Sequence, residues 1–181
     1  MRKLILVLAC VIIAGCTSSN KRILPENKNI KAVLIPFEDA QNKPGSGRIF
    51  SVAFKSALAK ISSKEKVPYI FLSTLDLNHA IKQLQLQQTD WEDPNKRHEI
   101  ARQAGANVII TGQVTVWNKG DLFKYAMVGF AAECVSLDTG KILWNIFETN
   151  NTGGWSVEER TPEYGAKKVA EKGIKTIVEK L

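Results

Sequence analysis

Alternation between strand-like and helix-like segments is the feature of this 181-residue sequence that most constrains its fold. Short apolar runs, some with period-two alternation, predict strands, and apolar residues at i, i+3, i+4 spacing predict amphipathic helices. The order β-α-β-α-α-β-β-β-α predicts an α/β fold, a two-layer sandwich on a mixed sheet of about five strands. The segments are strand 30–37, helix 50–61, strand 69–72, helices 74–84 and 94–105, strands 107–117, 122–137 and 141–149, and helix 162–181.

Local signals support this order. Ser73 begins a capping box, and Gly105 is placed to end a helix in the left-handed conformation that Ala resists. Gly112 suits a close backbone approach within the sheet, and Gly129 suits a β-bulge. Gly45 lies in a flexible turn, so Gly45→Ala is expected to destabilise the domain much less than Gly105→Val.

The first sixteen residues form a separate targeting segment. Arg2 and Lys3 precede an apolar run over residues 4–13, and small residues lead to Cys16, which is the layout of a secretory signal. The run is shorter than the about 20 apolar residues that span a bilayer. An ordinary secretory signal with an incidental cysteine is the alternative interpretation.

The ending Ile13-Ala14-Gly15-Cys16 resembles the lipobox of bacterial lipoproteins. The resemblance implies cleavage before Cys16, a diacylglyceryl thioether on its sulfur and an acyl chain such as palmitate on its new amino group. Two buried acyl chains already give stable anchoring. Thr17 stands where an inner-membrane retention signal would have Asp, so the resemblance also implies the periplasmic face of the outer membrane.

The expected organisation follows from this segment. Residues 1–15 are predicted to be a signal peptide, residues 16–29 a lipidated cysteine with a short polar tether, and residues 30–181 a single periplasmic α/β domain. The tether spans at most roughly 45 Å. Once cleavage removes Cys10 and lipidation uses Cys16, Cys134 is the only free thiol, in an apolar run that favours a buried small hydrophobe.

The chain carries a formal net charge of +7. An exported protein does not meet nucleic acid, so no nucleic-acid partner is expected. Anionic lipid, lipopolysaccharide or cell wall suit the compartment, whereas scattered, solvated lysines are the simpler explanation of the charge.

Three blocks of sequence resemble one group of bacterial lipoproteins and related domains. They are Ala101–Gly112, Lys31–Phe37 and Leu137–Trp144. The group contains the curli secretion lipoprotein (CsgG-type), the lipoprotein activators of penicillin-binding proteins and the N-terminal domain of TolB. The resemblance covers roughly residues 30–180 and implies the fold, with no catalytic residue to carry over.

The departures from the group bear on function. The curli secretion lipoprotein resembles a pore with added membrane-crossing hairpins, whereas the one long hairpin here, residues 122–149, is needed by the sheet itself and carries Lys124 and Glu133. Penicillin-binding protein activators use a long Pro-rich tether, whereas this tether contains only Pro25. A secretion pore is therefore not favoured, and direct activation of an inner-membrane synthase is a second choice.

No catalytic or metal-binding constellation stands out in the sequence. His98 and Glu99 begin a near miss of the zinc-protease motif, but Arg102 replaces the second histidine, and His79 lies on a different predicted helix. We therefore expect no enzyme activity, no metal and no cofactor. A cell-wall hydrolase that uses Asp90 or Glu92 is the remaining enzymatic alternative.

Loop residues are the candidates for partner binding. They are Trp91, Trp155, Asn118 and Lys119, although Trp155 follows two glycines and is equally explained as a lid over the core. The sequence thus predicts an outer-membrane lipoprotein that acts as a non-catalytic binding or assembly module of the cell envelope. The expected partners are the membrane, through the lipid on Cys16, and envelope proteins: a second copy of the chain or a peptidoglycan enzyme. A regulator of a peptidoglycan synthase is the alternative.

Overall fold

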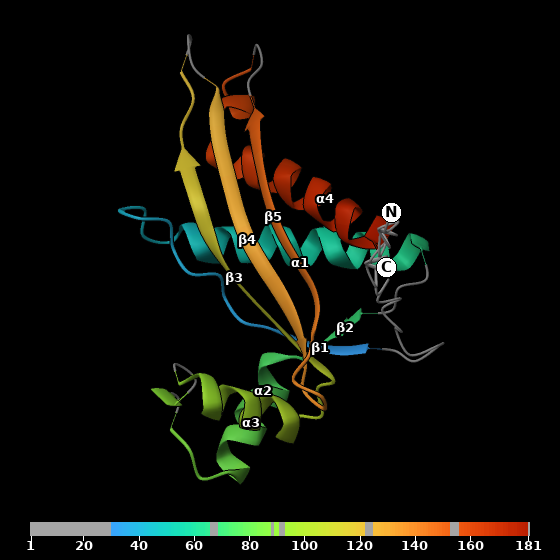
Figure 1. The fold of residues 1–181 in the computed structure, drawn as a ribbon. Helices are drawn as coiled ribbons and strands as arrows, with labels where there is room; N and C mark the ends of the chain where they lie inside the picture. Colours follow the sequence, from blue (N-terminus) through green and yellow to red (C-terminus); the bar gives the residue numbers. More distant parts are fainter. Residues whose placement is uncertain are drawn as a thin grey trace, which may run out of the picture.

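The computed structural model describes residues 30–65, 69–87, 89–90, 93–121, 125–152 and 156–180. Its elements follow the predicted order, with one short 3-10 turn, η2, before the last helix (Figure 1). They are β1 (Ile30–Leu34), α1 (Ser46–Glu65), β2 (Tyr69–Phe71), α2 (Thr74–Gln83), α3 (Pro94–Gln103), β3 (Val108–Asn118), β4 (Ala126–Ser136), β5 (Ile142–Thr152), η2 (Glu158–Arg160) and α4 (Pro162–Lys180).

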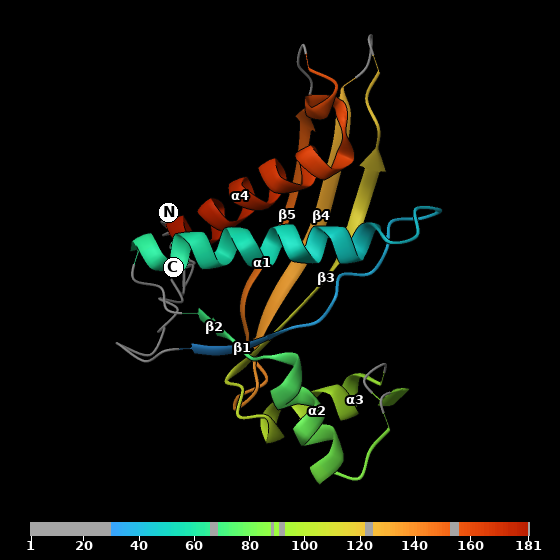
Figure 2. The same ribbon diagram turned by 180° about the vertical axis from the view of Figure 1, so that it is seen from behind.

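The described strands form one five-stranded mixed sheet in the order β2-β1-β3-β4-β5. β1 runs parallel to both β2 and β3, whereas β3, β4 and β5 pair antiparallel. α1 and α4 lie side by side across one face of the sheet (Figure 2). The α/β class and the two-layer arrangement are therefore confirmed, and α2 and α3 add a smaller cover on the opposite face, at the end near β1 (Figure 1).

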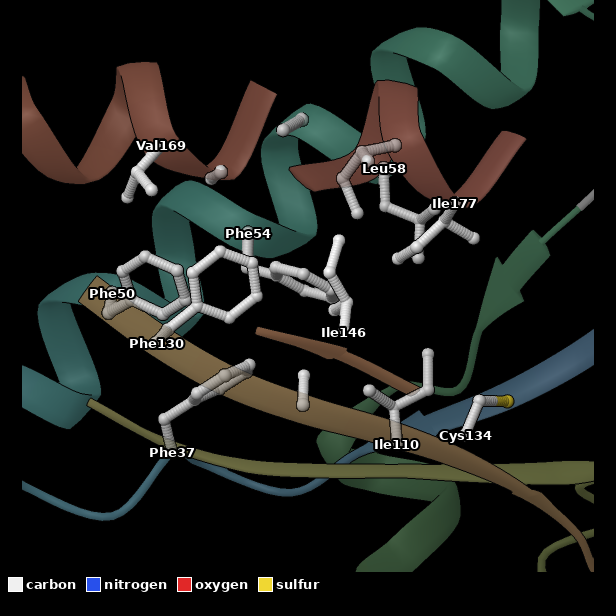
Figure 3. Close-up of a cluster of buried hydrophobic side chains, with 14 of the residues drawn as sticks. Phe37, Phe50, Phe54, Leu58, Ile110, Phe130, Cys134, Ile146, Val169 and Ile177 are labelled. Atoms are coloured by element: carbon white, nitrogen blue, oxygen red, sulfur yellow. The ribbon is translucent and has the colours of Figure 1, made fainter. Parts of the chain in front are cut away.

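The main core lies between the sheet and the α1–α4 layer. Four phenylalanines from three segments meet there: Phe37 after β1, Phe50 and Phe54 on α1, and Phe130 on β4 (Figure 3). The ring centroids of Phe50 and Phe130 are 4.7 Å apart, and those of Phe37 and Phe50 are 4.9 Å apart. Each buried ring contributes roughly 1.5–3 kcal/mol, so this cluster holds the helical layer against the sheet.

Strand alternation divides the sheet residues between the two faces. Ala32 of β1 and Ile110 of β3 belong to the main core, whereas their neighbours Val33 and Ile109 pack with Ala101 of α3 in a second cluster. Buried residues on both faces explain why β1 and the start of β3 read as continuous apolar runs. Cys134 is fully buried in the main core, as the sequence predicts.

The expected glycine cap at the end of α3 is confirmed, whereas the contrast in stability between Gly105→Val and Gly45→Ala stays a prediction. Gly105 has φ +80°, its N–H donates to Arg102 O, and the next N–H, of Ala106, donates to Ala101 O. This pair of hydrogen bonds is a Schellman motif. Gly45 has φ +84° as well, so an alanine there meets the same left-handed backbone strain.

Two further glycine predictions have different outcomes. A Cβ on Gly112 would lie 2.5 Å from Cε1 of Phe37, so the close approach is confirmed. The irregularity near Gly129 belongs to the partner strand, because the β3–β4 register shifts between Val114 and Val116. Thr115 is therefore the extra residue. The bulge lies in β3, so the prediction of a bulge at Gly129 of β4 is wrong.

Candidate functional site: a groove on the open sheet face

The face of β3, β4 and β5 opposite α1 and α4 carries two in-register rows of side chains. Thr111, Glu133 and Asn145 form one row across the three strands. The next row is Gln113, Ala131 and Phe147. These positions alternate with core residues, and because α2 and α3 cover only one end of this face, the rows stay accessible from the outside.

A groove with a volume of about 1240 Å³ runs over these rows. Residues 35–38 form one wall, because they continue along β3 through hydrogen bonds such as Glu38 N–H to Gly112 O. The helix α3 forms the other wall. The groove residues used below are Gln113, Ala131, Glu133, Asn145, Phe147 and His98.

Phe147 is the most prominent side chain of the groove. It is 64 % exposed and lies beside the small side chain of Ala131, so one flank of its ring is open to a partner. The Thr111 hydroxyl donates to Glu133 Oε1 at 3.4 Å, while Gln113 and Asn145 present exposed amides. An apolar ring surrounded by hydrogen-bonding groups is the composition of a recognition surface.

The position of α3 is fixed by specific polar contacts. Asp93 caps its first turn by accepting a hydrogen bond from Asn95 N–H, and Pro94 occupies the first helical position. At its other end, Arg102 donates from Nε and Nη2 to Leu137 O at 3.0 and 2.7 Å. The guanidinium therefore joins α3 to the β4–β5 turn and keeps the groove wall in place.

The predicted binding residues do not gather in this groove. Asn118 and Lys119 are exposed at the far end of β3, where Gly120 N–H donates to Arg160 O and ties the β3–β4 connection to η2. Cys16, Trp91 and Trp155 lie outside the described residues. Asp90 and Asp93 flank Trp91 in the α2–α3 connection, at the opposite end of the molecule from Asn118 (Figure 1).

Sequence reasoning missed several exposed apolar side chains, three of which lie on candidate binding surfaces. Tyr125 is 69 % exposed before β4 and Val157 is 76 % exposed before η2, both at the same end of the sheet as Asn118. Phe147 is the third. The alternation of β5 holds a signal for it, because Trp144 and Ile146 face the core and the residue after Ile146 must face outward.

The perturbed carboxyl groups have structural explanations. Backbone N–H groups of Gly45 and Gly47 donate to Asp39 and lower its pKa. The capping-box hydrogen bond from Ser73 lowers the pKa of Asp76. The ammonium of Lys96, at 2.6 Å, lowers the pKa of Asp90. These groups stabilise a turn, a helix cap and a loop, and none of the three lies in the groove.

The described residues show little that could support chemistry. Burial, and secondarily the charge of Glu133, raises the pKa of Cys134 to about 12. The ring Nδ1 of His98 lies 2.7 Å from Pro94 O, one turn earlier in its own helix. In the part of the chain that the structure describes, no three His, Cys, Asp or Glu side chains are placed to hold a metal ion. Nor is any described helix long and apolar enough to cross a membrane.

A scan against protein-family models and a search of curated proteins both gave no match for this chain. Solved structures with the same fold exist. The PelC dodecamer from Paraburkholderia phytofirmans has a TM-score of 0.52 at 15 % identity, over 84 % of this chain and 86 % of that chain. The LpoB C-terminal domain from Escherichia coli has a TM-score of 0.52 at 18 % identity, over 67 % and 82 %.

The lipoprotein GNA1162 from Neisseria meningitidis has a TM-score of 0.51 at 13 % identity, over 70 % of this chain and 83 % of that chain. At such identities, the likeness shows the fold. The structures named here do not include a curli secretion lipoprotein or a TolB domain, so that part of the resemblance stays a prediction. The chain shares the α/β fold of the LpoB C-terminal domain, PelC and the lipoprotein GNA1162.

Proposed function

We propose that this chain is a lipoprotein anchored on the periplasmic face of the outer membrane, whose α/β domain is a non-catalytic binding or assembly module of the cell envelope. The observation that carries the proposal is the open groove over β3–β5. Its exposed Phe147 and in-register polar rows provide groups for recognition. Its described residues provide no nucleophile next to a base.

The anchor rests on the sequence. Residues 1–15 act as a signal peptide, Cys16 carries the lipid, and residues 16–29 tether the domain in this proposal. Cys16→Ser should abolish lipidation because only a thiol forms the thioether. Metabolic labelling with an acyl precursor tests this, and equal label in the variant and the wild type would contradict the lipoprotein assignment.

The groove suits a protein partner better than a small metabolite. It is long and open, and a partner that covers Phe147 would bury a large apolar ring inside a polar rim, the arrangement typical of binding hot spots. The tip formed by Asn118, Lys119, Tyr125 and Val157 is a second contact surface at the far end of the sheet. Trp155, between β5 and η2 in the sequence, and Trp91, between α2 and α3, complete the set of proposed binding residues.

A peptidoglycan enzyme is one partner class that we consider, and a second copy of the chain is the other. With a peptidoglycan enzyme as its partner, the chain would be a regulator of a peptidoglycan synthase. The resemblance to penicillin-binding protein activators supports it, together with the fold shared with the LpoB C-terminal domain. With further copies of itself as partners, the chain would be an assembly component, and the fold shared with the PelC dodecamer is compatible with that role.

Site-specific photocrosslinking in the native envelope tests the proposal. A photoreactive amino acid replaces Phe147 in the groove or Tyr125 at the tip, and Leu75, which is exposed on α2, serves as the control position. We expect strong adducts from position 147 or 125 and few from position 75. A peptidoglycan synthase in the adducts favours the regulator, and the chain itself favours assembly. Equal yields at all three positions would contradict the proposal.

An activity assay tests the enzymatic alternative separately. The purified protein should leave peptidoglycan intact. Turnover that Asp90→Ala together with Glu92→Ala abolishes would instead establish a hydrolase and overturn the non-catalytic assignment.

A further inference from the structure

The outer face of α1 has the composition of a membrane-surface helix. Arg48, Lys55 and Lys60 are exposed on it, and Ile49 and Val52 lie among these cations with 37 % and 68 % of their surface exposed. The helix contains no acidic residue before its last position. Cations around exposed aliphatic side chains are typical of helices that lie in the headgroup region of a bilayer.

The neighbouring helix α4 extends this surface. A groove with a volume of about 590 Å³ runs between the two helices, with Ala53 of α1 in its lining and Lys167 of α4 at its rim. Glu163 and Glu171 also line this groove, and Glu171 forms an ion pair with Lys60 at 3.2 Å. The exposed α4 cations outnumber the three acidic residues of that helix. They are Lys167 and Lys168, together with Lys172, which forms an ion pair with Glu148 of β5 at 2.7 Å, and Lys175, which forms an ion pair with Glu179 at 3.9 Å.

The chain enters the domain beside this layer. Ile30, the first described residue, pairs with Tyr69, which follows α1 by four positions. The proposed tether therefore joins the domain close to the C-terminal end of α1. Its reach of at most roughly 45 Å exceeds the length of this 20-residue helix, about 30 Å. A lipid on Cys16 can therefore be inserted in a bilayer while α1 lies along the same surface.

We propose that the outer face of α1, with Lys167 of the adjoining helix α4, docks on an anionic phospholipid surface. Each cation near such a surface adds about fivefold to binding, equivalent to about 1 kcal/mol. Val52 and Ile49 then enter the headgroup layer. In this orientation, the opposite face of the sheet, with Phe147, is directed away from the membrane. The tether argument rests on the lipidation proposed above, whereas the composition of α1 does not.

The test uses the full-length lipidated protein, reconstituted in vesicles of phosphatidylcholine alone or with phosphatidylglycerol. Val52→Cys carries an environment-sensitive fluorophore, and peptide mass analysis confirms a single label, since Cys134 is buried. Phe147→Cys, labelled in the same way, is the control on the other face. We expect a blue shift at position 52 in phosphatidylglycerol vesicles, lost at about 1 M NaCl, where the Debye length is about 3 Å. Position 147 should not respond.

Charge variants make the test specific. Arg48→Gln with Lys55→Gln should raise the phosphatidylglycerol fraction needed for the shift and weaken binding about 25-fold. Lys141→Gln, in the β4–β5 turn, should have no effect. A position-52 signal that is the same in both vesicle types would overturn the proposal. A shift that appears on concentrating the protein without vesicles would also overturn it, because a second copy would then cover this face. Partner capture through Phe147 is measured independently, so either proposal can fail alone.

Discussion

Gly112→Ala should destabilise the domain strongly, although it adds only one methyl group. Gly112 lies in β3 where the chain passes under the aromatic cluster, and its φ is not in the left-handed region. An added Cβ would lie 2.5 Å from Cε1 of Phe37 and closer still to the carbonyl oxygen of Ala131 in β4. One of these neighbours is backbone, so the clash is not relieved by rotating a side chain.

The expected cost follows from what must move. Relief requires a shift both of the β3–β4 pairing and of Phe37, whose ring packs against Phe50 and Phe54 with centroid distances of 4.9 and 5.2 Å. Overpacking by a methylene costs typically 1–3 kcal/mol, and we expect about 3 kcal/mol here. In a domain of this size, that lowers Tm by roughly 6–12 °C.

Thermal unfolding followed by circular dichroism measures the effect, and a double-mutant cycle tests its cause. In a Phe37→Leu background, one of the two clashes is reduced, so Gly112→Ala should cost at least about 1 kcal/mol less than in the wild type. If Gly112→Ala melts within about 2 °C of the wild type, or if the two changes are additive, the close approach at Gly112 is not what constrains this position.

Three further predictions concern groups in and around the core. Tyr69→Phe removes the hydroxyl that accepts a hydrogen bond from Trp144 Nε1 at 3.1 Å, and the buried N–H left unpaired should cost about 1–3 kcal/mol in chemical denaturation. Burial raises the pKa of Cys134 to about 12, so this thiol should react with a thiol reagent at pH 8 only as fast as the domain unfolds. Fast labelling of the native protein would refute the burial of Cys134. The folded structure lowers the pKa of Asp39 from 3.8, so the ionised carboxylate stabilises the folded state above pH 3.8 and this stabilisation is lost as the pH falls below that value. Asp39→Asn should therefore make the free energy of unfolding less dependent on pH in the acid range.

Much of the fold was predictable because local patterns and long-range packing agree. The helix and strand periods, the capping box at Ser73 and the cap at Gly105 appear where the sequence indicates them. The bulge lies in β3 and not in β4, because Gly129 pairs with Val116 and the neighbouring residue Thr115 is the one without a partner. Which strand holds the extra residue depends on register, which local sequence does not determine.

The candidate site was much less predictable. The groove joins residues 35–38, α3 and three strands, so it exists only after the sheet and the α3 contact from Arg102 to Leu137 have formed. Asn118 and Lys119 are exposed as expected, since the end of a strand marks a loop in the sequence. Trp144 and Phe147 are both aromatic residues of β5, but only Trp144 is buried, because the alternation of the strand places the two on opposite faces of the sheet.

The central claim, that the chain binds an envelope partner through the open groove, is tested most directly by quantitative co-purification. The amount of the partner identified by crosslinking is measured after purification of three tagged proteins, the wild type, Phe147→Ala and Ile142→Ala. Ile142 is the control, because it is an exposed aliphatic residue on the same strand outside the groove. All three should have the same Tm. Phe147→Ala should reduce partner recovery about tenfold, as expected for a hot-spot aromatic, while Ile142→Ala leaves it unchanged. Equal recovery with Phe147→Ala and the wild type would contradict the account.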